Sequence, residues 1–110
     1  MPEMQGVQRI VAFTDRAVVP PHVLIRHMDG ESVLLNLDSE IYFGLDTMGT
    51  RMWHLVTNSP NIEAAHGILA EEFEIEPELL RHDLMTLMGQ LVHHGLVKML
   101  PADEESLPAV

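Results

Sequence analysis

The chain has no cysteine among its 110 residues, which excludes a disulfide framework and thiol chemistry. It has no apolar run near the roughly 20 residues that a membrane-spanning helix needs. Its N-terminus lacks a basic stretch followed by an apolar segment, so no signal peptide is expected. Aromatic residues make up only 5% of the chain, so aliphatic side chains and eight methionines must fill the core. These absences predict one small cytoplasmic domain.

Positive charge is also scarce. Six Lys and Arg stand against 17 Asp and Glu, which gives a formal net charge of −11. The six basic residues are scattered along the sequence, whereas nucleic acids and anionic membranes are bound by clusters of Lys and Arg. Composition therefore predicts neither a nucleic-acid partner nor a membrane partner.

Three short segments, 22–28, 32–37 and 41–45, have the alternating pattern of strands. Asp29-Gly30 supplies the positive φ angles of a tight hairpin turn, and the polar residues 38–40 form a second turn. The segments therefore predict an antiparallel meander. We expect its last strand, 41–45, to lie at the margin of the sheet, where unpaired backbone groups can accept another chain. Pairing of that strand with residues 7–13 of the same chain is the alternative.

The periodicity becomes helical after Asp46. Three amphipathic segments follow, with Asp46, Asn61 and Pro77 at their N-terminal ends and Gly95 at the end of the last. Strands followed by helices predict an α+β domain, a three-stranded antiparallel sheet covered by a three-helix bundle. We assign residues 18–100 to this domain, 1–17 to a flexible N-terminal arm and 101–110 to a flexible acidic tail.

An ordered set of short motifs spans residues 16–100. In chain order it reads Asp29-Gly30, Leu34-Leu35-Asn36-Leu37-Asp38, Tyr42-Phe43-Gly44-Leu45-Asp46, Gly49, Trp53, Ile62-Glu63-Ala64, Pro77-Glu78-Leu79, Asp83, Leu91 and Gly95-Leu96. With this spacing the chain resembles the PqqD-like family. Members have a winged helix-turn-helix-like fold and are known as recognition elements for ribosomally made, post-translationally modified peptides. The sequence of these motifs is most similar to the stand-alone proteins of lasso-peptide pathways.

The resemblance implies a non-catalytic chaperone that binds the leader peptide of a precursor. The leader would pair as an added strand between the third strand and the third helix, and a partner enzyme such as a leader peptidase or a cyclase would act on it. The implied peptide-binding residues are Ile41, Tyr42, Phe43, Gly44, Leu80, Arg81, Asp83, Leu84 and Leu87.

Several of the implied residues have a physical role in this hypothesis. Gly44 lacks a side chain, so a guest residue can approach closely. Asp83 would receive a donor or a cation, and Arg81 would hold an acidic guest residue. The leucines would form the floor of the groove.

The sequence offers little support for other functions. The seven His have no ligand partners at suitable spacing, and no nucleophile or acid–base constellation is recognisable, so no metal, cofactor or enzyme activity is expected. The main alternative is a winged-helix DNA-binding regulator, although the third helix offers only Arg81 and Gln90 to base edges. A peptide-binding scaffold outside natural-product biosynthesis and a homodimer formed through the open edge stay open.

Overall fold

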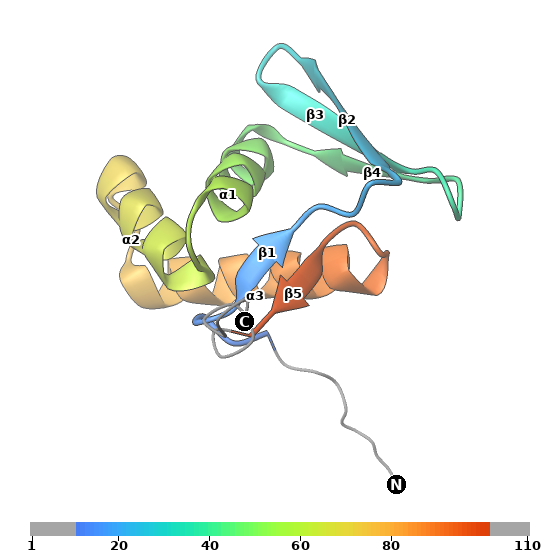
Figure 1. The fold of residues 1–110 in the computed structure, drawn as a ribbon. Coiled ribbons are helices and arrows are strands. Elements are labelled where there is room, and N and C mark those ends of the chain that lie inside the picture. Colours follow the sequence, from blue (N-terminus) through green and yellow to red (C-terminus); the bar gives the residue numbers. More distant parts are fainter. Residues whose placement is uncertain (1–10, 102–110) are drawn as a thin grey trace, which may run out of the picture.

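The computed structural model describes residues 11–101 (Figure 1). Strands β2 (Val23–Met28), β3 (Glu31–Asn36) and β4 (Ile41–Leu45) form an antiparallel sheet in that order. The helices α1 (Thr47–Asn58), α2 (Ile62–Phe73) and α3 (Pro77–His93) follow. The predicted α+β, winged-helix-like fold with a three-stranded sheet and three helices is therefore confirmed.

Local signals fix most of these boundaries. Asp29 and Gly30 have φ angles of 52° and 83°, so both central residues of the β2–β3 turn adopt the left-handed conformation that this tight hairpin requires. The side chain of Asp46 accepts a hydrogen bond from the Gly49 N–H at 2.8 Å and begins α1. Asn61 caps α2 in the same way through the N–H of Ala64.

The core lies between the inner face of the sheet and the three helices. α3 contributes four fully buried side chains, Leu80, Leu84, Met88 and Leu91, and β3 contributes Leu34. Because side chains alternate along a strand, the neighbours of Leu34, Val33 and Leu35, lie on the outer face of the sheet.

A second, two-stranded sheet ties the ends of the described chain together. β1 (Arg16–Val18) pairs antiparallel with β5 (Lys98–Leu100), and Figure 1 shows this ribbon beside α3. The predicted boundary of a flexible arm at residue 17 is therefore wrong. Phe13 is buried, and its carbonyl accepts a hydrogen bond from the Glu63 N–H at 2.8 Å. Residues 1–10, and all of the predicted tail except Pro101, lie outside the described residues.

None of the described helices is both long enough and apolar enough to span a bilayer.

Candidate functional site

β4 lies at one edge of the three-stranded sheet. It pairs with β3 from Ser32 opposite Leu45 to Asn36 opposite Ile41. In the part of the chain that the structure describes, residues 11–101, no strand pairs with its other side. β2 forms the opposite edge, so the sheet offers two margins to an incoming strand, and the flanking elements must distinguish them.

The side chains of β4 alternate between the two faces of the sheet. Tyr42 is 71% exposed on the outer face, and Phe43 packs against the core from the inner face. Gly44 lies on the same face as Tyr42, and a Cβ atom placed there would meet no atom within 4 Å. Ile41 is 39% exposed. The edge thus presents apolar surface together with open space at Gly44.

The C-terminal end of α3 approaches β4. The ring of Phe43 is 5.6 Å from the ring of His94, the residue that follows α3. Since an α-helix turns about 100° per residue, positions 83, 87, 90 and 94 fall within about 60° of one another around the axis. Asp83 and Gln90 are exposed, and Leu87 is partly buried against the core. Asp83 and Leu87 therefore share the side of the helix axis that faces β4 at its C-terminal end.

Three of the residues predicted on α3 lie elsewhere. Leu80 and Leu84 have 0% exposure and belong to the core, so neither forms the floor of an open groove as the sequence had suggested. Arg81 hydrogen-bonds to Glu63 of α2 at 3.2 Å, and its guanidinium lies 4.1 Å from the centre of the Phe13 ring. It is about 140° around the helix from His94, on the flank away from β4.

Gln90 and His94 lie on the same side of the helix axis as Asp83 and Leu87 but were not among the residues predicted to bind a peptide. Helical spacing from Asp83 and Leu87 was the signal that could have found them, because positions seven and eleven residues after Asp83 share its side of the helix. Choosing this side over that of Arg81 required the tertiary contact between Phe43 and His94.

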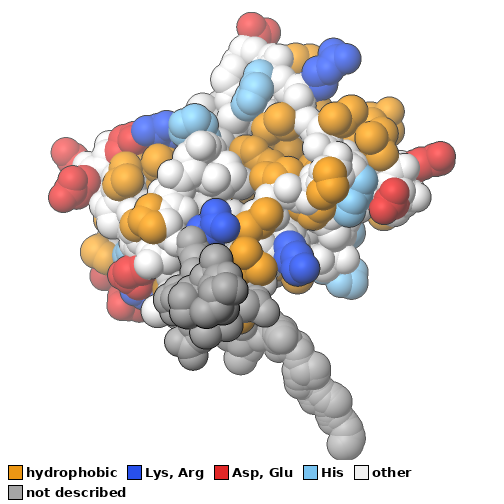
Figure 2. Space-filling model, viewed as in Figure 1, with side chains coloured by type: hydrophobic (Ala, Val, Ile, Leu, Met, Phe, Trp, Pro, Cys, Tyr) orange, Lys and Arg blue, Asp and Glu red, His pale blue; other side chains and the backbone are white. Residues whose placement is uncertain are grey.

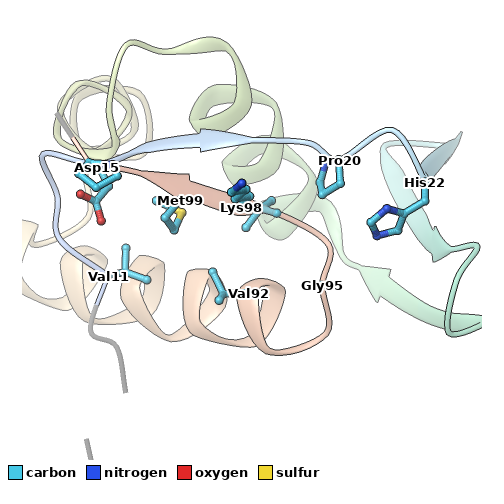
Figure 3. Close-up of a pocket in the computed structure, with 10 residues that line it drawn as sticks. Val11, Asp15, Pro20, His22, Val92, Gly95, Lys98 and Met99 are labelled. Carbon is cyan, nitrogen blue, oxygen red and sulfur yellow. The ribbon is translucent and has the colours of Figure 1, made fainter. Parts of the chain in front are cut away.

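Two of the surface hollows bear on this site. One, of about 480 Å³, lies on the outer face of the sheet and is lined by Leu24, Arg26, His27, Met28, Val33, Leu35 and Tyr42. Hydrophobic side chains gather over the sheet in Figure 2, with Asp and Glu at the periphery of the view. The other, of about 500 Å³, lies between α3 and the β1–β5 ribbon, where Val92 faces Met99 and Lys98 (Figure 3). No α3 residue lines the first hollow and no β4 residue lines the second.

The described residues contain no group of three or more His, Asp or Glu able to hold a metal ion. The buried His66 has its Nε2 atom 3.0 Å from the carbonyl of Pro77. An exposed bidentate pair joins Arg51 of α1 to Glu72 of α2, with both N–O distances 2.8 Å. Hydrogen bonding to Arg51 lowers the pKa of the Glu72 carboxyl from its ordinary value. These side chains stabilise the fold away from β4.

A small antiparallel sheet with an open margin, followed by three helices, defines a winged-helix-like α+β domain. The chain belongs to the PqqD family, because the family model for coenzyme PQQ synthesis protein D matches residues 31–97. A search of curated proteins finds no match.

Two solved structures are similar over most of the fold. The first is TbiB1 in complex with the TbiA(beta) leader peptide, at 28% sequence identity and a TM-score of 0.69, covering 74% of this chain and 94% of that one. The second is a lasso peptide synthetase B1 complexed with the leader peptide, at 19% identity and a TM-score of 0.68, covering 76% and 98%. The second likeness concerns the fold alone. The resemblance to the PqqD-like family is thereby confirmed.

Proposed function

We propose that this protein is a non-catalytic adaptor that binds the leader peptide of a ribosomally made, post-translationally modified peptide. The leader would add as a strand to the free edge of β4 and be presented to a partner enzyme. The observation that carries the proposal is the open side of β4 in a chain that shares 28% identity with a protein solved in complex with a leader peptide.

Strand addition suits this edge on physical grounds. Main-chain hydrogen bonds along an added strand give affinity with little demand on the sequence of the guest, and alternate guest side chains supply selectivity. On the outer face those side chains would lie next to Tyr42 and the open space at Gly44. On the inner side they would meet the flank of α3 that carries Asp83 and Leu87. No aromatic contact of this kind joins the described residues of β2 to α3.

Antiparallel pairing of the guest with β4 would define where its two ends lie. If it runs antiparallel to β4, its C-terminal end lies beside Ile41, where Phe43 and His94 bring the end of α3 close. A leader precedes the segment to be modified. That segment would therefore leave the adaptor beside Ile41 and His94, and the partner enzyme, such as a leader peptidase or a cyclase, would meet it there.

Calorimetric titration of the full chain with leader peptides encoded near its gene tests the proposal. We expect one-to-one binding that Phe43→Pro weakens, since proline removes a backbone donor that β4 uses to pair with β3 and so distorts the edge. Circular dichroism would show whether that variant keeps the sheet. Arg26→Ala, at an exposed position on the β2 edge, is the control and should leave leader binding unchanged. Absence of leader binding, or tight sequence-selective binding to DNA in a gel shift, would refute the proposal.

A further inference from the structure

Asn36 joins the beginning of β4 to the end of α3. It is the last residue of β3 and is only 4% exposed. Its Nδ2 group donates to the carbonyl of His94 at 2.9 Å and lies 3.4 Å from the carbonyl of Gly95. Its Oδ1 atom accepts from the N–H groups of Asp38 at 2.9 Å and Ser39 at 3.2 Å. One amide therefore satisfies both the turn before β4 and the C-terminal end of α3.

The bonds to α3 have a clear physical value. The last carbonyls of a helix have no partner within the helix, and Asn36 supplies one from a different element. An amide is suited to this place because it carries both a donor and an acceptor group, and here each is used. Its own backbone carbonyl also accepts from the Glu40 N–H at 2.7 Å, which fixes the turn that leads into β4.

Gly95 is matched to the same contact. It has a φ angle of 70°, and a Cβ atom placed on it would lie 2.9 Å from Nδ2 of Asn36. A side chain at position 95 would therefore push the amide away. The glycine permits both the left-handed end of α3 and the close approach of Asn36.

We infer that Asn36 is a positioning residue that fixes the spacing between β4 and α3, and so sets the width available to a strand bound between them. The inference rests on the proposed function. Asn36 need not touch the guest. It holds the carbonyl of His94, whose ring contacts Phe43 in the middle of β4. Freed from Asn36, the end of α3 and the edge of β4 would no longer keep a fixed separation.

Asn36→Asp tests the donor role of the Asn36 side chain separately from its acceptor role. It keeps the acceptor for the turn but replaces the donor with an oxygen that faces the carbonyls of His94 and Gly95. We expect leader affinity to fall by about tenfold or more in a protein that is still folded. We also expect the nuclear Overhauser contact between the Phe43 and His94 rings to weaken in the free protein, an effect that lower stability alone would not produce.

Asn61 offers two matched controls on α2. Asn61→Asp adds the same negative charge, and Asn61→Ala removes a helix cap and so lowers stability. Both should bind leader as tightly as the unchanged protein at a temperature where all variants are folded. If Asn36→Asp does not fold, Gly95→Ala displaces the same amide and is expected to weaken leader binding in the same direction.

Two outcomes would overturn the inference. One is an Asn36→Asp protein that binds leader within about twofold of the unchanged protein, and the other is a Phe43–His94 ring contact that persists in that variant. Failure of the unchanged protein to bind any leader would instead refute the proposed function. In that case the ring contact, measured without leader, still decides whether Asn36 positions the end of α3.

Discussion

The rings of Phe43 and His94 lie 5.6 Å apart with their planes tilted by 46°. Phe43 sits in the middle of the edge strand, and His94 directly follows the last helix. This contact brings the C-terminal end of α3 to the middle of β4. Its position around the helix axis also distinguishes the α3 residues on the same side as His94 from those that pack in the core or against α2.

Tyr42→Ala tests the exposed side of the edge. Tyr42 is 71% exposed and no bond holds its hydroxyl among the described contacts, so its removal should leave thermal stability nearly unchanged. Leader affinity should fall by about 1–2 kcal/mol through lost apolar contact. Calorimetry measures the affinity, and Ile68→Ala on α2, another exposed apolar site, is the control. Equal affinity in Tyr42→Ala would place the guest away from the outer side of β4.

Leu84 and Leu87 separate core packing from peptide contact. Leu84 is fully buried, so Leu84→Ala should lower the free energy of unfolding by about 2–5 kcal/mol. Leu87 is only partly buried, so Leu87→Ala should cost less stability but weaken leader binding. Denaturant unfolding and calorimetry of both variants give the comparison. The distinction fails if Leu84→Ala loses more affinity than Leu87→Ala when both proteins are fully folded.

The sequence predicted the fold where the signals are local. The Asp29-Gly30 turn, the caps at Asp46 and Asn61, and the glycine at position 95 each act within a few residues, and the structure has all of them. β1 and β5 were missed because each has three residues and they pair across most of the chain. No local pattern marks such a pairing, and the buried Phe13 gave no period from which to infer it.

The candidate site was harder to predict for a related reason. The apolar period of α3 identified Leu80 and Leu84, but period alone does not tell a core position from the floor of a groove. Nor could it tell on which flank Arg81 and Asp83 lie. Packing of α2 and Phe13 against Arg81 settles that question, and both are tertiary contacts.

Arg81 and Asp83 are predicted to behave in opposite ways. Arg81→Ala removes the contacts with Glu63 and Phe13 and should lower the free energy of unfolding by about 1 kcal/mol without changing leader affinity. Asp83→Ala should keep the stability and weaken a leader that carries a donor or a cation at the matching position. Thermal unfolding and calorimetry test both. Loss of affinity in Arg81→Ala alone would mean that the guest lies on the α2 flank.

The Arg51–Glu72 pair gives a pH dependence with a defined sign. Its hydrogen bonds lower the pKa of the Glu72 carboxyl from 4.5 in the folded state. The stabilisation is therefore complete above pH 4.5 and disappears as the pH falls through the lowered value. In Arg51→Met the Glu72 carboxyl should titrate at higher pH, measured by carbon NMR of that carboxyl. Because both side chains are exposed, the effect on unfolding is small, and an unchanged titration would contradict the pairing.

Amide hydrogen exchange with and without a bound leader tests the central claim most directly. Within Ile41–Leu45, the amides that face away from β3 are expected to exchange more slowly once the leader is bound, because they join a new ladder. The amides of Val23–Met28, on the opposite edge, should exchange at their original rate. Protection that appears in β2 instead, or leader saturation with no change in β4, would contradict the account.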